Sequence, residues 1–264
     1  MADIARPIIP DLAGRAILIT GASTGIGAAL AKAFAAQGAR VAVHYHASAK
    51  AAEAVAKAIG EAGGEAGGEA FLVRGDVTKS SETARIVEET AAHFGGLDGL
   101  INNAGLMVGR MAYADMTDTF YDAVMDLNAR SVIIACKTAI PWLKKRGGFI
   151  INTTSIAARN GAGPGAGLYG SAKAFVSNVT RGLAKELIGS GIRVNAVAPG
   201  VIDTPFHERY STATQMQAMV ATIPQGRAGT AEDCVGAYLF LASPSLSGYV
   251  VGQVIEVNGG QLMP

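Results

Sequence analysis

Charged residues are scarce in this chain, because Asp, Glu, Lys and Arg together make up only 16% of its 264 residues. The 22 basic residues nearly balance the 21 acidic ones, so the formal net charge is +1. Such a small net charge creates no strong field that would attract nucleic acid or an anionic membrane surface. The composition therefore argues against both as partners.

Cysteine and histidine are also few, with two and four residues. Cys136 and Cys234 lie far apart in apolar stretches. Their separation predicts neither a disulfide framework nor a zinc site, and it is typical of a reducing compartment. The histidines show no spacing typical of metal ligands, so we expect no metal site. They are His44, His46, His93 and His207.

Long apolar runs are missing too. The stretch from Met1 to Pro10 has no apolar run behind a basic end, as a signal peptide would. No later stretch reaches the roughly 18 uninterrupted apolar residues of a membrane span. We therefore expect a soluble, cytoplasmic protein.

What the chain does contain is a regular alternation of strand-like and helix-like segments. Short β-branched runs alternate with alanine-rich stretches, which predicts a parallel sheet. The runs are apolar throughout, so helices should cover both faces of a doubly wound sheet. The expected strands are Ala16 to Thr20, Arg40 to Val43, Phe71 to Arg74, Gly99 to Asn102, Phe149 to Thr153, Arg193 to Val197 and Val254 to Val257. We expect one α/β domain over residues 1–264, with 1–13 as an N-terminal extension and a ligand site at the carboxyl ends of the strands.

One low-complexity stretch interrupts this pattern between Gly60 and Ala70. Glu61-Ala62-Gly63-Gly64 is repeated at once as Glu65-Ala66-Gly67-Gly68. Glycine disfavours helix because it loses much backbone entropy on folding. We interpret the repeat as a duplicated surface loop without a functional role.

A glycine-rich turn follows the first expected strand directly. It reads Thr20-Gly21-Ala22-Ser23-Thr24-Gly25-Ile26-Gly27, and a helical pattern runs from there to Gly38. Glycines let the backbone turn tightly and approach a pyrophosphate, whose charge is favoured by the N–H groups and the dipole at a helix start. Strand, glycine turn and helix together indicate a dinucleotide site.

The glycine spacing is Gly-x-x-x-Gly-x-Gly, and with it the chain resembles the short-chain dehydrogenase/reductase family. Three further motifs stand in the order typical of that family: Asn102-Asn103-Ala104-Gly105, Tyr169-Gly170-Ser171-Ala172-Lys173 and Pro199-Gly200. The resemblance extends from about Gly14 to Gly260. It implies a Rossmann-like single-domain fold of about seven strands and an oxidoreductase that uses NAD or NADP.

The resemblance also implies which residues bind the cofactor. In the family an acidic residue at the end of the second strand usually holds the adenosine ribose of NAD, and here that position is Tyr45. Its lack of charge, with His44, His46, Ser48 and Lys50 nearby, favours NADP, although Thr24 stands where many NADP-preferring relatives have a basic residue. The expected cofactor residues are Gly21, Ser23, Thr24, Gly25, Ile26, Gly27, Tyr45, His46, Asp76, Val77, Asn103, Ala104, Gly105, Tyr169, Lys173, Pro199, Gly200, Ile202 and Thr204.

Two of these positions have an equally ordinary structural interpretation. Asp76 resembles the family's adenine-contacting aspartate, but it would also suit a turn or a helix cap. Thr204 would lie beside the nicotinamide carboxamide, or it belongs to an Asp-Thr-Pro turn that binds nothing.

The expected catalytic pair is Tyr169 and Lys173. A spacing of four residues places both side chains on one face of a helix. A nearby ammonium favours the phenolate of a tyrosine, whose ordinary pKa is about 10, so Lys173 would tune Tyr169 as a general acid/base. Such a pair also occurs by chance in many helices, as a half-buried tyrosine beside an extended lysine.

Two further residues complete the constellation that the resemblance implies. Ser155 corresponds to the family serine that hydrogen-bonds the substrate oxygen, although Thr154 is a neighbouring hydroxyl and either could cap its own strand end. Asn128 corresponds to the family's helix asparagine, whose backbone holds a water that links the lysine to solvent. An asparagine inside a helical pattern is locally unfavourable, which favours a kink or a functional role there.

Together these residues predict hydride transfer between a nicotinamide and a carbonyl or secondary alcohol, with Tyr169 passing the proton. The substrate would be a 3-oxoacyl or related ketone, and a sugar or polyol is the alternative. A different class of function is a catalytically silent dinucleotide-binding protein. Epimerisation or dehydration goes with a longer substrate-binding part in the extended relatives, for which this chain lacks the length. Enoyl reduction usually goes with a Tyr-to-Lys spacing wider than the four residues found here.

Residues 202–225 are the expected substrate lid, because aromatic and flexible apolar side chains gather there. They include Phe206, His207, Tyr210, Met216 and Met219, which would equally serve ordinary helix packing. Relatives are often tetramers built through the helices around Asn128 and Tyr169 and through the C-terminal strand. The apolar pattern from Ser131 to Trp142 fits such a homotetramer interface, and it fits a monomer core as well.

Overall fold

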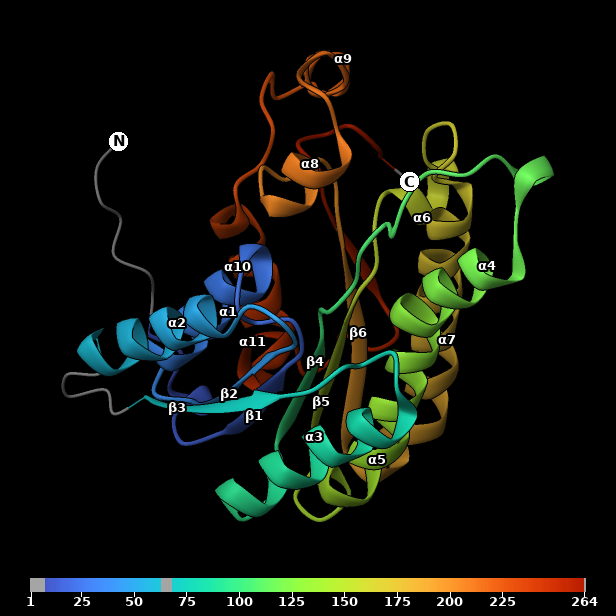
Figure 1. The fold of residues 1–264 in the computed structure, drawn as a ribbon. Coiled ribbons are helices and arrows are strands. Elements are labelled where there is room, and N and C mark those ends of the chain that lie inside the picture. Colours follow the sequence, from blue (N-terminus) through green and yellow to red (C-terminus); the bar gives the residue numbers. More distant parts are fainter. Residues whose placement is uncertain (1–7, 63–67, 264) are drawn as a thin grey trace.

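The structure is a computed structural model that describes residues 8–62 and 68–263. Seven parallel strands form one sheet in the order β3-β2-β1-β4-β5-β6-β7 (Figure 1). They are β1 (Ala16–Ile19), β2 (Arg40–Tyr45), β3 (Glu69–Arg74), β4 (Gly99–Asn102), β5 (Gly148–Thr153), β6 (Ile192–Pro199) and β7 (Val254–Val257). The predicted doubly wound α/β fold is confirmed, and each expected strand is present with ends shifted by at most two residues.

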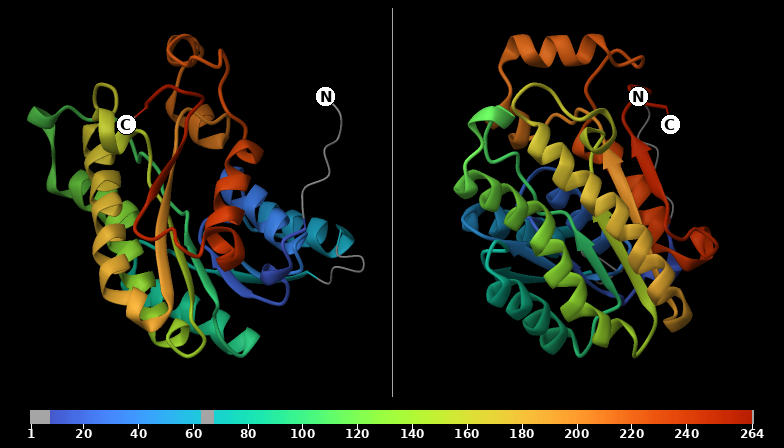
Figure 2. Two further views of the ribbon diagram at one scale, coloured as in Figure 1. Left: turned by 180° about the vertical axis from the view of Figure 1, so that it is seen from behind. Right: turned by 90° about the vertical axis from the view of Figure 1, so that its right-hand side faces the viewer.

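Helices cover both faces of the sheet, as the uninterrupted apolar strands predict. One face carries α1 (Gly25–Ala35), α2 (Ala49–Ala62), α10 (Ala231–Ala242) and α11 (Pro244–Ser247). The other carries α3 (Ser80–Phe94), α4 (Asp118–Met125), α5 (Ser131–Leu143) and α7 (Gly167–Leu187) (Figures 1 and 2). The sheet order reverses between β1 and β4, and ligands of such sheets bind at the carboxyl ends beside this reversal.

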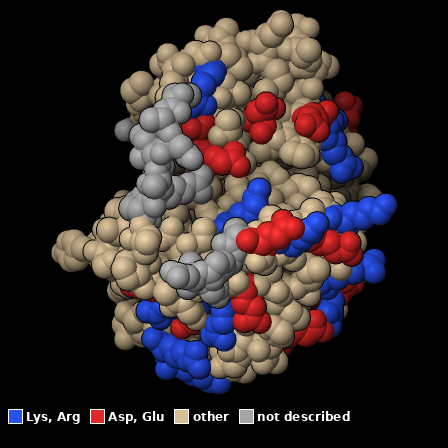
Figure 3. Space-filling model, turned by 90° about the vertical axis from the view of Figure 1, so that its left-hand side faces the viewer, with Lys and Arg blue, Asp and Glu red and all other residues tan. Residues whose placement is uncertain are grey.

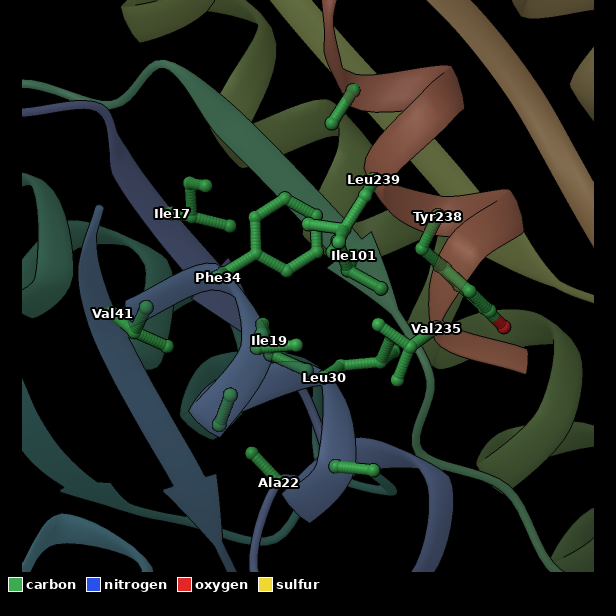
Figure 4. Packing of buried hydrophobic residues seen from close by; sticks show 14 of the residues in the cluster. Ile17, Ile19, Ala22, Leu30, Phe34, Val41, Ile101, Val235, Tyr238 and Leu239 are labelled. Carbon is green, nitrogen blue, oxygen red and sulfur yellow. The ribbon is translucent and has the colours of Figure 1, made fainter. Parts of the chain in front are cut away.

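Each face of the sheet has its own hydrophobic core. Phe34 of α1 packs between Ile17 of β1 and Leu239 of α10, with Ile101 beside it (Figure 4). On the other face the buried residues of α3 and α5 pack on β1, β4 and β5. At the start of β4, a side chain on Gly99 would collide with the ring of Phe149. Because Gly99 has no side chain, β4 can pair with β5 directly opposite the large ring of Phe149.

Part of the expected N-terminal extension is tied to the domain. Its last residues form a short turn, Pro10–Leu12, and Leu12 is buried. The Asp11 carboxylate accepts hydrogen bonds from Ser243 Oγ and the Ser245 backbone at the start of α11. These contacts join the beginning of the chain to the C-terminal helices.

The segment predicted to be a lid lies beyond the carboxyl ends of the strands (Figures 1 and 2). It contains α8 (Pro205–Tyr210) and α9 (Ala213–Ala221), which stand apart from the two helical layers. No residue of α9 is buried. The short α6 (Ala157–Asn160) lies at the same end, between β5 and α7.

The predicted duplicated loop falls largely outside the described residues. Helix α2 runs through Gly60 to Ala62, and the description resumes at Gly68, just before β3. Within the described ranges, no helix has the length and apolar character needed to cross a membrane. On the face drawn in Figure 3, basic and acidic side chains are interspersed, as the near-zero net charge predicts.

Candidate active site

The glycine turn joins β1 to α1 at the reversal of the strand order. Gly21 and Gly25 adopt φ values of 64° and 53°, which only glycine takes without strain. A side chain on Gly27 would collide with the carbonyl of Gly21. The three glycines of the motif therefore shape the turn and let α1 start close against it.

The start of α1 offers backbone N–H groups toward the strand ends. Thr24 is the N-cap residue, yet its side chain makes no cap hydrogen bond. An uncapped helix start leaves donors and a partial positive charge, which suits a pyrophosphate. Thr204, at the start of α8, lies opposite, since its side chain is 3.4 Å from the position of a Cβ on Gly25.

The end of β4 is bound to the same turn by a set of short hydrogen bonds. Asn103 Nδ2 donates to the carbonyls of Thr20 (3.0 Å) and Gly21 (3.1 Å). The backbone N–H groups of Asn103 and Ala104 both donate to Thr20 Oγ1, each at 3.0 Å. This network explains why a small motif follows β4: it fixes the chain where a cofactor ribose would lie.

The adenosine side of the expected site lies at the ends of β2 and β3. Tyr45 is half-buried and His46 is exposed, as expected for residues that could meet a ligand. His44 differs from the prediction: it is only 2% exposed, and its ring bonds Gly21 N and Gly75 O. It therefore cannot reach a phosphate, and its place next to Tyr45 in the sequence does not favour NADP.

A basic residue that the sequence analysis did not identify lies beside the adenosine end of the expected site. Arg74 pairs with Tyr45 in the register of β2 and β3, and its Nε donates to the His46 carbonyl at 3.3 Å. Its place at the end of the neighbouring strand was the available signal. Asp76 accepts from Thr78 N (3.0 Å) and Thr78 Oγ1 (2.7 Å), so its carboxylate does serve the turn. Val77 beside it is 6% exposed and packs in the core.

Tyr169 and Lys173 face each other from successive turns of α7. Lys173 Nζ lies 5.9 Å from the centre of the Tyr169 ring and donates to the Thr153 carbonyl at 2.9 Å. Lys173 is 3% exposed, and this burial lowers its pKa to about 8. Burial raises the pKa of Tyr169 to about 12, although a hydrogen bond with Ser155 opposes the rise. Desolvation is the largest effect on the phenol, and the tuning of Tyr169 by Lys173 stays a prediction.

The two neighbouring hydroxyls at the end of β5 have different surroundings. Ser155 lies close enough to Tyr169 to lower the pKa of the phenol, and its Oγ accepts from Ala157 N at 3.1 Å. Thr154 Oγ1 instead donates to the Lys173 carbonyl at 2.8 Å and lies 2.6 Å from Ser177 Oγ. Of the two candidates, Ser155 is therefore the one placed beside the phenol.

Asn128 lies in a π-helical turn, Asp126–Arg130, between α4 and α5. This is the irregularity that an asparagine within a helical pattern suggests. The side chain is fully buried, and Nδ2 donates to the carbonyls of Leu106 (2.8 Å) and Val124 (2.9 Å). Its Oδ1 has no hydrogen-bond partner among the described residues, which is a costly state that often marks a functional site.

Gly105 is the point where this asparagine and the lysine meet. A Cβ there would lie 2.8 Å from Asn128 Oδ1 and 2.9 Å from Lys173 Nζ. The absence of a side chain thus keeps open the space that both polar groups border. At the end of β6, Gly200 has a similar role, because a Cβ would lie 2.7 Å from the Asn258 side chain. Pro199 ends that strand, and Ile202 forms a bridge with Gly229 below α8.

Aromatic side chains of α8 border Tyr169. The Phe206 ring lies 5.8 Å from the Tyr169 ring and 5.2 Å from the Tyr210 ring, measured between centroids. Arg110, which was missed from the sequence, donates to Pro164 O at 2.9 Å and to Tyr210 O at 3.5 Å. It joins the loop after β4, the loop before α7 and α8. Met216 and Met219 lie farther along, on α9, and are partly exposed.

No group of three or more His, Cys, Asp and Glu side chains within residues 8–62 and 68–263 is arranged to hold a metal ion. The residues at the carboxyl edge of the sheet do suit a dinucleotide. The adenosine end, the glycine turn, the β4 end and Lys173 follow one another along the carboxyl edge of β2, β1, β4 and β5.

Comparisons with known proteins agree with this geometry. The family model described as Enoyl-(Acyl carrier protein) reductase matches residues 21–261. A 3-oxoacyl-[acyl-carrier-protein] reductase of Synechocystis sp. is 38% identical over 257 residues, which are 96% of this chain and 98% of that protein. The chain belongs to the short-chain dehydrogenase/reductase family. A 3-oxoacyl-[acyl-carrier-protein] reductase of Staphylococcus aureus is 37% identical over 94% of this chain and 98% of its own length.

Solved structures of this short-chain dehydrogenase/reductase family superpose closely. An NADH-dependent reductase responsible for alginate metabolism is 41% identical, with a TM-score of 0.87 over 97% of this chain and 100% of that one. A short-chain dehydrogenase from Burkholderia cenocepacia in complex with NADP is 34% identical, with a TM-score of 0.87 over 95% of this chain and 99% of the other. The relatives thus include proteins named for each of the two nicotinamide cofactors.

Proposed function

We propose that this protein is an NAD(P)-dependent ketoreductase whose substrate is a 3-oxoacyl compound or a related ketone. The observation that carries the proposal is the convergence of Ser155, Tyr169 and Lys173 at the carboxyl end of β5, beside the glycine turn. The relatives named 3-oxoacyl-[acyl-carrier-protein] reductase support the substrate class, because they match almost from end to end.

The catalytic residues suit reduction in particular. A bound nicotinamide supplies the hydride in such a reaction, and the protein supplies the proton and the positioning. With its pKa raised to about 12, Tyr169 is protonated at neutral pH and can donate to a carbonyl oxygen. The Ser155 hydroxyl would bond the same oxygen and stabilise the charge that develops there. Asn128 and Lys173 would deliver the replacing proton from the space beside Gly105.

The residues that would hold the cofactor lie along the strand ends in order. The start of α1 would bind the pyrophosphate, Asn103 to Gly105 would border a ribose, and Thr204 would lie near the nicotinamide. Tyr45, His46 and Arg74 would meet the adenosine ribose. We favour NADP over NAD because Tyr45 brings no negative charge and Arg74 adds a positive one nearby.

A second candidate substrate is a carbohydrate-derived carbonyl compound. It is suggested by the 41% identical reductase that is named for alginate metabolism. The observation in its favour is that polar side chains accompany the aromatic ones near Tyr169: His207 lies on α8 next to Phe206, and Arg110 donates to the Tyr210 carbonyl at 3.5 Å. Both substrate classes would use the same catalytic residues. They differ only in the substrate groups that the surrounding side chains must bind.

The test is a screen of the purified protein with NADPH and NADH against 3-oxoacyl thioesters, simple ketones and sugar-derived carbonyl compounds, followed by the absorbance of the reduced nicotinamide. We expect the fastest oxidation with NADPH and a 3-oxoacyl thioester. Faster turnover of the carbohydrate series would favour the second candidate. Cofactor binding without turnover of any carbonyl would instead make the chain a catalytically silent dinucleotide-binding protein.

We further propose that the protein is a cytoplasmic homotetramer with a single domain over 1–264 and a substrate lid at 202–225. Support for the assembly comes from exposed apolar side chains on the helices where the family commonly associates. Ile133 on α5 is 36% exposed and Phe175 on α7 is 40% exposed. Light scattering of the purified protein at micromolar concentration measures the mass, and a monomeric mass would contradict the proposal.

A further inference from the structure

His44 occupies an unusual place for a histidine at the end of a strand. It is the fifth residue of β2, is 2% exposed, and lies between the glycine turn and the end of β3. Gly21 N donates to His44 Nδ1 at 2.9 Å, and His44 Nε2 lies 3.0 Å from the Gly75 carbonyl. Both ring nitrogens are therefore engaged with backbone, and neither is available to solvent or ligand.

These two contacts determine the protonation state of the ring. A backbone N–H can only donate, so Nδ1 must carry a lone pair toward Gly21. A carbonyl can only accept, so Nε2 must carry the hydrogen toward Gly75. Only the neutral imidazole with its proton on Nε2 satisfies both partners, because imidazolium would turn an N–H toward the Gly21 N–H.

The groups around the ring agree with the neutral form. Burial lowers the pKa of His44 to about 4, and the nearby charges of His46 and Arg85 act in the same direction. The Gly75 hydrogen bond and Asp76 oppose this change but are outweighed. The ring therefore stays neutral throughout the physiological pH range.

The backbone around His44 continues the same connection. Ala22 N donates to the His44 carbonyl at 2.8 Å, and Gly75 N donates to the Tyr45 carbonyl at 3.0 Å. Gly75 itself has no room for a side chain, since a Cβ would lie 2.6 Å from Ile86 Cδ1. The His44 ring thus spans the two loops that would contact the pyrophosphate and the adenosine end of a dinucleotide.

We propose that His44 is a positioning residue for the dinucleotide: it clamps the glycine turn at Gly21 to the end of β3 at Gly75, and so fixes the distance between the pyrophosphate and adenosine subsites. The inference rests on the proposed use of NAD(P). His44 itself does not touch the cofactor. Its loss should weaken cofactor binding and leave the catalytic group at Tyr169 intact.

Three substitutions separate the two hydrogen bonds. His44→Leu removes both, His44→Asn keeps an acceptor near the Nδ1 position, and His44→Gln places an amide near the Nε2 position. His93→Leu is the matched control, because it makes the same change at a histidine of α3 that bonds Glu69, away from the glycine turn. Dissociation constants for NADPH and NADH are measured by calorimetric titration, with kcat at saturating cofactor and the melting temperature as further readouts.

We expect His44→Leu to raise the dissociation constants about tenfold or more, because it leaves the partly buried Gly21 N–H without an acceptor. His44→Asn should recover most of the affinity and His44→Gln little of it, while kcat at saturating cofactor stays within about twofold of the parent protein. The control should bind as the parent does. Unchanged affinity in His44→Leu, or equal affinities of the Asn and Gln variants if the Leu variant does not fold, would overturn the inference. Failure of the parent protein to bind either cofactor would instead overturn the proposed function.

Discussion

Tyr169 carries the proton that a reduction requires, because burial raises its pKa to about 12 and keeps the phenol protonated at neutral pH. Ser155 opposes this rise in pKa, and the Tyr169 ring lies 5.8 Å from the Phe206 ring, measured between centroids. The hydroxyl would thus take part in the reaction, whereas the ring provides the packing. The phenol can therefore be changed without changing the shape of the site.

We expect Tyr169→Phe to lower kcat by about 100-fold or more, because it removes the proton donor from the reacting oxygen. The dissociation constant of the cofactor should stay close to that of the parent, since the ring that packs on Phe206 remains. Steady-state kinetics and calorimetric titration measure the two quantities. Ser171→Ala, an exposed change on the same helix, serves as the control. Near-normal turnover of Tyr169→Phe would remove this residue from the mechanism.

The lowered pKa of Lys173 predicts how kcat for reduction changes with pH. The pKa of this lysine is lowered to about 8 by burial, so the ammonium is present below that pH and is lost above it. Tyr169, with a pKa of about 12, stays protonated across the same range. We expect kcat for reduction to be level from about pH 6 to 7 and to fall with an apparent pKa near 8. A profile that stays level to about pH 10 would show that the lysine charge does not matter.

At the scale of elements, the site is built where β4, the π-helical turn and α7 meet. Asn128 and Lys173 come from different elements and reach the same space beside Gly105. A regular α-helix through Asp126–Arg130 would turn the asparagine to another direction. The irregular turn is therefore part of the site rather than a defect of the helix.

Gly105→Ala tests this convergence directly. The added methyl group would lie 2.8 Å from Asn128 Oδ1 and 2.9 Å from Lys173 Nζ, so one of the two must move. We expect kcat to fall about tenfold or more while the protein remains folded, as followed by steady-state kinetics and circular dichroism. Gly182→Ala on α7 is the control, because a methyl group there meets nothing within 4 Å. Equal kinetics for the two variants would contradict the assigned geometry.

Elements differ in how far the sequence could predict them. The strands could be predicted because buried parallel strands are apolar without interruption. The four-residue spacing placed Tyr169 and Lys173 on one helix face, and the family resemblance singled this pair out. The burial of His44 could not be read in this way. It depends on Gly75, which is 31 residues away and meets the ring only when β3 lies beside β2. The choice between Thr154 and Ser155 likewise needed the position of α7, to which the Thr154 hydroxyl is bonded.

At the scale of the whole molecule, each layer of helices contains one cysteine. Cys136 belongs to the core beneath α3 and α5, and Cys234 belongs to the core beneath α1 and α10. Both thiols are buried, and burial raises the pKa of each to about 12. The two residues are natural reporters for the opening of the two layers.

We expect neither thiol to react with an aromatic disulfide reagent at pH 8 in the native protein, because each is buried and protonated. In denaturant both should react. Near the unfolding midpoint, the two modification rates should be equal if the layers open together, as expected when one sheet supports both cores. Mass spectrometry of digests resolves the two sites. Rapid reaction of one cysteine alone in buffer would contradict the packing of that layer.

The reversal of the strand order between β1 and β4 separates two parts of the sheet, and these correspond to the first and second parts of the chain. The residues expected to meet the adenosine and the pyrophosphate come before β4, whereas the residues proposed to transfer the proton and the proposed lid come after it. Recombination between relatives at a crossover near residues 77–99 would therefore exchange cofactor preference without exchanging the reaction or its substrate. The two halves are joined by the pairing of β1 with β4, by the hydrogen bonds between Thr20 and Asn103, and by cores to which both halves contribute.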